Sequence, residues 1–332
     1  MPLGRRNLMT DVPGLRVGNA QDLVVRSGVT VVVPDEPVAA AVDVRGGGPG
    51  TAETDLLDPA ATVPHVDALV LSGGSAFGLE ARAGVAAWMA TQDRGYPVAG
   101  VHVPIVPTAI LFDLINGGDK DWGELPPYRT LGRDAVMAAD LDFALGNSGA
   151  GTGARAGSLK GGLGSASWIL PDGTAVGALV AVNSLGSAVE PESGAFWSWM
   201  LEQQDEFGGS PRPTRPLADL DATAGEGWPV PGANTTLAIV ATDAGLDKVG
   251  CRRLAIMAQD GLARALRPIH SPLDGDTVFA LSTARRPEPD LQGLAVLGRA
   301  MADCLARAVA RGVWAAERMG DIPSWRERYG SR

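Results

Sequence analysis

Thr235 is the residue of this chain whose position best suits nucleophilic chemistry. It stands in GANTTLAIVATD (residues 232–243), where a polar segment gives way to an apolar, strand-like run. A threonine hydroxyl is a weak nucleophile unless a base lies beside it, and an N-terminal threonine supplies that base with its own α-amine. The pKa of an α-amine is about 7.7–8.0, so part of it is neutral near pH 7.

Freeing the amine of Thr235 requires cleavage of the bond between Asn234 and Thr235. In this chemistry the hydroxyl attacks the carbonyl carbon before it, and water hydrolyses the resulting ester. A flexible segment before the threonine and a rigid strand after it suit the reaction. The same residues also fit an ordinary boundary between a loop and a strand, so the local sequence leaves both interpretations open.

Two glycine-rich loops follow strand-like segments, which is where phosphate groups bind in nucleotide sites. They read RGGGPGT (residues 45–51) and SGGSAFG (residues 72–78). Neither contains the GxxxxGK[ST] pattern, and the second departs from GxGxxG. We interpret both as tight turns or as a pocket lined by backbone rather than as a nucleotide site.

The three histidines give little support to metal or serine-triad chemistry. No two of His65, His102 and His270 stand at ligand spacing, and DGD at residues 274–276 is too short for an EF-hand loop. The chain has no GxSxG motif, and His270 has no evident serine partner. We therefore expect neither a metal site nor a cofactor.

The elements that must position Thr235 can be predicted from apolar runs and periodicity. Besides the strand that begins near Thr235, the expected strands are 29–33, 39–44, 66–72, 165–170, 175–182 and 277–281, and the expected helices are 77–92, 247–267 and 290–318. Prolines 104 and 107 make residues 102–114 irregular or an edge strand. Residues 203–233 are expected to form a loop.

Composition and charge narrow the class of protein. The chain has 332 residues, of which 45% are hydrophobic and 20% charged, as in a globular protein with a large core. A net charge of −10 disfavours nucleic acid as a partner, and no run of about 18 apolar residues suggests a membrane span. Cys251 and Cys304 lack CxxC spacing, so we expect reduced core cysteines in a cytoplasmic protein.

Five segments, in order along the chain, resemble one family of enzymes. They are DVRGGGPGTAETDLLDP (43–59), VDALVLSGGSAFGLEA (66–81), GAGTGARAGSLKGGLGSAS (149–167), NTTLAIVATDA (234–244) and HSPLDGDTVFALST (270–283). The family is that of the N-terminal-nucleophile hydrolases that contains the L-aminopeptidase/D-amidase-esterases, the β-peptidyl aminopeptidases and the nylon-oligomer (6-aminohexanoate oligomer) hydrolases. Five ordered blocks are more specific than any single motif.

The resemblance implies a fold of the α/β (α+β) class, a four-layer αββα sandwich. It implies one hydrolase domain over residues 1–332 that cleaves itself between Asn234 and Thr235 into fragments 1–234 and 235–332, which stay together. These fragments carry net charges of −13 and +3, which are complementary. The resemblance also implies a homo-oligomer, often a tetramer, without a cofactor.

The resemblance further implies roles for individual residues. Thr235 would be the nucleophile. Lys160 in SLKGG would lower the pKa of the neighbouring amine or stabilise negative charge, and Asn183 in AVNSLG would donate to the oxyanion. Asp274 and Asp276 match positions that hold the nucleophile or bind a substrate ammonium. Without the resemblance, the four supporting residues would be a loop lysine, a turn asparagine and a DG turn before a strand.

Three residues are candidates for substrate binding. Gly74 and Ser75, in the second glycine loop, would line the cleft with backbone. Phe112 in AILFDL stands where characterised β-aminopeptidases and nylon hydrolases carry a tyrosine. Any role of that tyrosine hydroxyl is therefore not carried over to this chain, and its substrate preference is in doubt.

The implied function is that of a self-processing amidohydrolase. It would form an acyl-enzyme on Thr235 and cleave amide bonds of small peptides or of ω-amino-acid oligomers that have a free amino group. One alternative is acyl transfer, as in the ornithine acetyltransferases, although the chain lacks their extended match. The other is a non-catalytic binding protein on the same scaffold, which an uncut chain after purification would favour.

Overall fold

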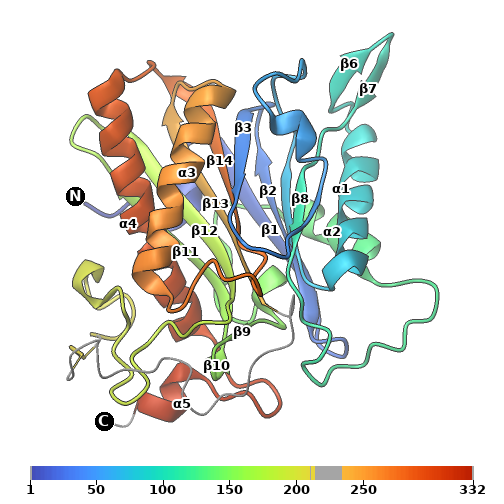
Figure 1. The fold of residues 1–332 in the computed structure, drawn as a ribbon. Helices are drawn as coiled ribbons and strands as arrows, with labels where there is room; N and C mark the ends of the chain where they lie inside the picture. The colour runs from blue at the N-terminus through green and yellow to red at the C-terminus, as the bar shows by residue number, and fades with distance from the viewer. Residues whose placement is uncertain (1, 210, 214–233, 331–332) are drawn as a thin grey trace.

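Two five-stranded sheets lie face to face in this protein, with helices on their outer faces (Figure 1). The computed structural model describes residues 2–209, 211–213 and 234–330. Within the expected loop 203–233, the described part holds neither helix nor strand, and residues 210 and 214–233 lie outside the described residues.

The strands of the second sheet are mostly longer than those of the first. The first contains, in spatial order, β1 (Leu15–Asp22), β2 (Ser27–Pro34), β5 (Leu69–Ser72), β8 (Thr108–Ile110) and β4 (Gly50–Ala52). The second contains β11 (Gly162–Ile169), β12 (Ala175–Asn183), β13 (Thr235–Ala244), β14 (Thr277–Arg286) and β3 (Ala39–Val44). In the second sheet only β13 and β14 run parallel to each other.

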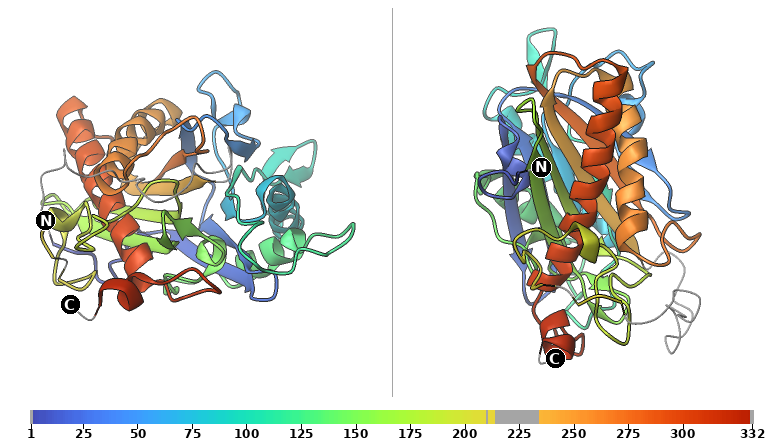
Figure 2. Two further views of the ribbon diagram at one scale, coloured as in Figure 1. Left: turned by 60° about the horizontal axis from the view of Figure 1, so that its bottom comes forward. Right: turned by 90° about the vertical axis from the view of Figure 1, so that its left-hand side faces the viewer.

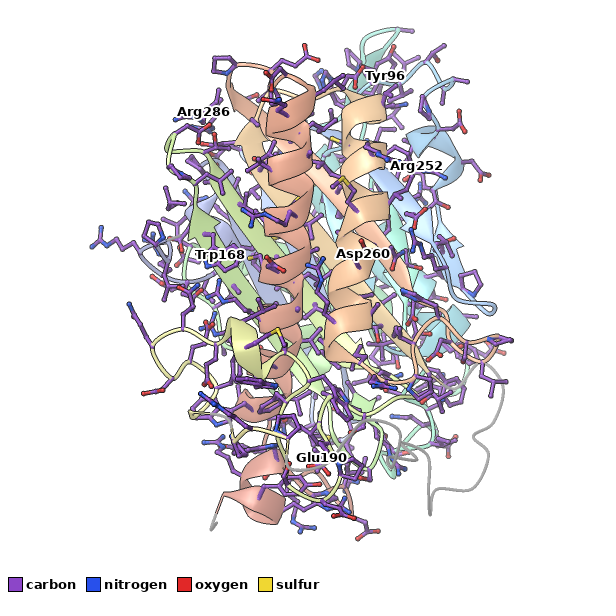
Figure 3. All side chains as sticks on the ribbon, turned by 60° about the vertical axis from the view of Figure 1, so that its left-hand side comes forward. Tyr96, Trp168, Glu190, Arg252, Asp260 and Arg286 are labelled. Carbon is purple, nitrogen blue, oxygen red and sulfur yellow. The ribbon has the colours of Figure 1, made fainter. Side chains whose placement is uncertain are left out.

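Helices cover both outer faces. They are α1 (Ala81–Ala90), α2 (Tyr128–Met137), α3 (Lys248–Ala265), α4 (Leu291–Ala315) and the short α5 (Trp325–Tyr329). The pair α3–α4 lies on the second sheet and the pair α1–α2 on the first, as the left view of Figure 2 shows. Figure 3 shows α3 and α4 side by side, with the exposed Arg252 and Asp260 on the outer side of α3.

The remaining elements are short. They are the hairpins β6 (Tyr96–Val98) with β7 (Val101–Val103) and β9 (Arg155–Ala156) with β10 (Leu159–Lys160), and five 3-10 turns: η1 (Met9–Asp11), η2 (Asp55–Leu57), η3 (Ser75–Glu80), η4 (Gly149–Gly151) and η5 (Trp199–Leu201).

Side-chain alternation along β13 explains the layering. Leu237 and Ile239 pack in the core between the two sheets, whereas Ala238 and Val240 pack in the core between the second sheet and α3–α4. A third core lies between the first sheet and α1–α2. A strand buried on both faces has a continuous apolar sequence, as β13 does. Three cores between four layers confirm the predicted αββα sandwich.

Several predicted elements need correction. The predicted helix over 77–92 begins as the 3-10 turn η3 and becomes α-helical only at Ala81. The prediction that residues 102–114 are irregular or an edge strand was wrong for β8, which lies between β5 and β4 inside the first sheet. Prolines 104 and 107 precede β8, so their missing N–H groups leave its ladder intact, and the carbonyl of Pro107 accepts the N–H of Val70.

Candidate active site

Thr235 opens β13, the middle strand of the second sheet, and its side chain is buried. Across the antiparallel pair β12–β13 it lies opposite Asn183, the last residue of β12. Its Oγ1 donates a hydrogen bond of 2.6 Å to the carbonyl oxygen of Asn234. The sheet therefore places the hydroxyl, the Asn183 side chain and the Asn234–Thr235 peptide bond at one end of β13.

The turn before β14 reaches the same peptide bond. Gly275 donates its N–H to the carbonyl oxygen of Asn234 at 3.0 Å. A Cβ atom added at Gly275 would lie 2.6 Å from Thr235 Oγ1 and 2.7 Å from the carbonyl oxygen of Gly48. The Asn234 oxygen thus has two hydrogen-bond donors, and the close approach leaves no room for a side chain at position 275.

Asp276 uses both of its carboxylate oxygens near Thr235. Oδ1 accepts the N–H of Thr236 at 2.8 Å, and Oδ2 accepts the N–H of His270 at 3.0 Å. The same Oδ2 lies 2.9 Å from Nδ1 of the His270 imidazole. Asp276 is fully buried, so this carboxylate fixes the start of β13 from inside the protein.

Asp274, two residues earlier, is also fully buried. Its Oδ2 accepts the hydroxyl of Ser271 at 2.5 Å, and its Oδ1 accepts the N–H of Leu185 at 3.3 Å. Burial, and then the charge of Asp276, raise the pKa of the Asp274 carboxyl. A cationic group placed beside the Asp274 carboxyl would favour its charged form.

Asn183 connects Thr235 with Phe112. Its Nδ2 donates to the carbonyl oxygen of Phe112 at 3.0 Å, and its Oδ1 accepts the N–H of Arg155 at 2.9 Å. Phe112 itself is half-buried. In this uncut chain the Asn183 amide is bound to backbone, and the N–H that reaches the Asn234 carbonyl belongs to Gly275.

Lys160 is buried at the same end of the sheet. It lies two residues before Gly162, which pairs with Val182, the neighbour of Asn183. Its Nζ donates to the carbonyl oxygens of Gly151 and Gly161, both at 2.9 Å. Burial lowers the pKa of Lys160 from its ordinary 10.5 to about 7, and the charge of Asp113 opposes this shift. Its charge is therefore adjustable near neutral pH.

Gly74 contacts Asp113, and Ser75 contacts Leu111, so within the described residues the hydrogen bonds of neither reach Thr235. Gly74 donates its N–H to Asp113 Oδ1 at 2.8 Å, and Ser27 donates its hydroxyl to Asp113 Oδ2 at 2.7 Å. The Tyr128 hydroxyl donates in turn to Ser27 at 3.1 Å. Gly74 has φ +84°, and a Cβ there would lie 2.1 Å from the Tyr128 ring. Ser75 donates its N–H to the carbonyl of Leu111.

The structure thus joins Thr235, Asn234 and Asn183 by a hydrogen bond and strand pairing, and Asp276 binds the N–H of the next residue, Thr236. Lys160 shares their end of the sheet but, among the described residues, has no hydrogen bond to Thr235. Within the same part of the chain, no cluster of three metal-binding side chains occurs and no helix is long and apolar enough to cross a bilayer.

Sequence reasoning missed three residues at or near this site: His270, Gly275 and Asp113. Two of them are sequence neighbours of predicted site residues: Gly275 lies between Asp274 and Asp276, and Asp113 follows Phe112. His270 was set aside for lack of a serine partner, but its partner is a carboxylate six residues downstream in the same loop.

Residues 7–323 match the model of peptidase family S58. The chain belongs to peptidase family S58. This confirms the resemblance found in the sequence, and it identifies the protein as a hydrolase of the aminopeptidase and amidase class. An uncharacterized aminopeptidase of Mycobacterium tuberculosis is 46% identical in an alignment that covers 97% of this chain and 98% of the relative.

Two further comparisons place this S58 member. A 6-aminohexanoate-oligomer endohydrolase of Kocuria sp. is 29% identical over 299 residues, which cover 87% of this chain and 79% of the relative. The solved structure of the L-aminopeptidase D-Ala-esterase/amidase of Ochrobactrum anthropi, a variant of the Ntn-hydrolase fold, has a TM-score of 0.71 at 22% identity. That comparison covers 99% of this chain and 96% of the other. The likeness to the solved structure concerns the fold.

Proposed function

We propose that this S58 member is a self-processing amidohydrolase with Thr235 as its N-terminal nucleophile. The observation that carries the proposal is the geometry at the Asn234–Thr235 bond. The Thr235 hydroxyl lies 2.6 Å from the Asn234 carbonyl oxygen, and the Gly275 N–H donates to that oxygen. A nucleophile beside a carbonyl whose oxygen already has a donor is an arrangement suited to acyl transfer.

Self-cleavage would proceed in two steps. Thr235 Oγ1 attacks the carbonyl carbon of Asn234, the C–N bond breaks, and the hydroxyl proton passes to the leaving nitrogen, so that Thr235 gains a free amine. Water then hydrolyses the ester, which leaves a carboxylate on Asn234 and the hydroxyl on Thr235. The N–H of Gly275 stabilises the negative charge that develops on the carbonyl oxygen in both steps.

Turnover of substrate would use the freed amine of Thr235 as general base. Its hydroxyl attacks the substrate amide, the amine product leaves, and water hydrolyses the ester. Lys160, whose pKa is about 7, supplies a positive charge that can tune the pKa of this amine or stabilise the oxyanion. Asn183, opposite Thr235, is placed to turn its amide from the Phe112 carbonyl to a substrate oxygen.

The substrate we propose is a small peptide or an ω-amino-acid oligomer with a free amino group. The buried carboxyl groups of Asp274 and Asp276 support an ammonium partner, because a nearby cation favours their charged forms. The name of the Kocuria relative supports the oligomer class. Gly74 and Ser75 would act indirectly, through Asp113 and the Phe112 segment. No cofactor enters this mechanism.

Intact-mass analysis of the purified protein tests the nucleophile. The wild type should give two fragments, the smaller beginning at Thr235, whereas Thr235→Ala should remain one chain. Thr236→Ala is the matched control, because this neighbouring hydroxyl has no hydrogen-bond partner in the described structure. It should be cut like the wild type. An uncut wild type, or a cut Thr235→Ala variant, would rule the mechanism out.

Release of amine from aminoacyl p-nitroanilides, β-dipeptides and 6-aminohexanoate oligomers would then rank the substrates.

We also expect a cytoplasmic homo-oligomer in which the two fragments stay associated. Light scattering on the processed protein measures the oligomeric state.

A further inference from the structure

The two oxygens of Asp276 have separate partners, and this division makes His270 part of the site. Oδ1 accepts the N–H of Thr236, the residue directly after the proposed nucleophile. Oδ2 accepts the N–H of His270 and contacts its Nδ1. Imidazole, carboxylate and the backbone of β13 therefore form one connected chain of hydrogen bonds that ends one residue from Thr235.

The carboxylate of Asp276 supplies an acceptor that the sheet itself lacks. The parallel pairing of β13 with β14 begins at Leu237, opposite Thr277. Thr236 lies between this ladder and an isolated parallel bridge at Asn234–Asp274, and its N–H is held from the β14 side by the Asp276 side chain instead of by backbone. A buried N–H needs a partner, and this one also fixes the direction in which β13 leaves Thr235.

The His270 ring is held in the orientation that this contact needs. Asp276 acts as an acceptor toward both backbone N–H groups, so we assign the proton of the contact to Nδ1 of the ring. His270 has φ +57°, in the left-handed region, where histidine is one of the more frequent residues after glycine, together with asparagine and aspartate. This backbone conformation brings both the N–H and Nδ1 of His270 to the same carboxylate oxygen.

We propose that His270 is a positioning residue for Thr235 that acts through Asp276. The Nδ1–H of His270 keeps the carboxylate turned so that its other oxygen binds the N–H of Thr236. This contact in turn holds Oγ1 of Thr235 at the Asn234 carbonyl. The inference rests on the proposed function, because it assigns His270 to the same self-cleavage reaction.

Two substitutions with equal backbone tolerance test the role of the ring. Asparagine and glycine both accept the left-handed conformation at position 270, and both keep the backbone N–H that binds Asp276. His270→Asn retains a side-chain donor near the place of Nδ1, whereas His270→Gly has none. The appearance of the 235–332 fragment is followed by mass spectrometry after cell-free synthesis of the full chain.

We expect His270→Asn to be cut at a rate within about threefold of the wild type. His270→Gly should be cut about ten- to a hundredfold more slowly, because small displacements of a nucleophile reduce rates by such factors. The melting temperatures of both variants, measured with Thr235→Ala so that each remains one chain, should stay above the assay temperature.

Three outcomes would overturn the positioning role while leaving the proposed function intact, provided that the wild type is cut and Thr235→Ala is not. The first is cleavage of His270→Gly at the wild-type rate, and the second is equal slowing of both variants. The third is a melting temperature of His270→Gly below the assay temperature, since unfolding would then explain its slow cleavage. An uncut wild type would instead remove the proposed function and this inference together.

Discussion

In the proposed function, the hydroxyl of Thr235 would take part in two reactions, self-cleavage and substrate turnover, and only in turnover would a free amine of the same residue serve as base. In the uncut chain, its nitrogen is part of a peptide bond, and the hydroxyl donates to the Asn234 carbonyl oxygen. An amide nitrogen is a very weak base before the carbonyl is attacked, so self-cleavage would depend on polarising the carbonyl, as the N–H of Gly275 would do. We therefore expect self-cleavage to be slower than turnover.

Lys160 makes the free energy of unfolding depend on pH, and the sign of this dependence follows from the pKa of Lys160. Its folded pKa of about 7 lies below the ordinary 10.5, so between these values the unfolded chain binds more protons. The free energy of unfolding should then rise with pH from about 7 to about 10.5, by up to about 1.4 kcal/mol per pH unit. The slope between pH 7 and 9 should be smaller in Lys160→Met.

Urea unfolding at several pH values measures these slopes, with Thr235→Ala as the background in both proteins so that one chain unfolds. The Met variant also removes the Lys160 hydrogen bonds to the carbonyls of Gly151 and Gly161, of which Gly151 keeps the N–H of Ala154, and this loss lowers stability at every pH. The slope is therefore compared rather than the absolute stability. Equal slopes in the two proteins would show that Lys160 does not titrate in this range.

At the scale of elements, a buried ion pair joins the loop after η5 to α4. Arg307 of α4 contacts Glu206 through Nε at 2.6 Å and Nη2 at 2.8 Å. Arg307 is fully buried and lies over the ring of Trp168 at 5.1 Å. Removing one partner of a buried pair leaves the other charge uncompensated, which is costly.

Glu206→Gln should therefore lower the free energy of unfolding by about 3 kcal/mol. Adding Arg307→Met should recover part of this loss, because it removes one of the two charges that Glu206 faces. Arg311, whose Nε lies 3.5 Å from Glu206 Oε2, keeps the other. Both variants are measured by urea unfolding in the Thr235→Ala background. Glu327→Gln, which breaks the exposed pair with Arg318, is the matched control and should cause no measurable change. A loss that Arg307→Met does not reduce would contradict this account.

Helices and strands could be predicted from the sequence where their apolar residues repeat with a single helical or strand periodicity. The helices α3 and α4 and the central strands carry regular apolar patterns, and their predicted ranges match the structure within a few residues. By contrast, α2 was not predicted, and Gly132 in its middle argues against a helix. The reason for this glycine is tertiary: a Cβ there would lie 2.2 Å from the carbonyl of Ala81 in α1.

The same limit applies to the site. Thr235 could be proposed as the nucleophile because five segments of the chain resemble one enzyme family, since its local sequence alone also fits an ordinary boundary between a loop and a strand. The pairing of Thr235 with Asn183 depends on strand register, and the contact of His270 with Asp276 depends on how a loop folds. Neither leaves a periodic signal, so they become visible only in three dimensions.

For the whole molecule, the proposed cut divides elements that share the same cores. Leu179 of β12 and Ile239 of β13 pack in one core, and Val180 of β12 and Leu305 of α4 pack in another. The opposite net charges of the fragments, −13 and +3, add an attraction that salt screens. Apolar burial and strand pairing do not weaken in this way.

The processed fragments should therefore elute together in size-exclusion chromatography at 1 M NaCl, where the Debye length is only about 3 Å. They should separate only when denaturant unfolds the shared cores. The same column at about 0.1 M NaCl is the control. Separation at high salt alone would mean that charge, not the common core, holds the fragments together.

The strand order of the second sheet affects how the protein would fold before the proposed cut and refold after it. β13 and β14 stand between β12 and β3, so after the proposed cut both neighbours belong to the other fragment. Before the cut, the sheet assembles within one chain, at a rate independent of concentration. Afterwards, reassembly would need two chains to meet while the outer edges of β13 and β14 are unprotected. The proposed processing would therefore change the order of the folding reaction: the chain would fold as one molecule before the cut, and after denaturation it would refold only as a bimolecular reaction.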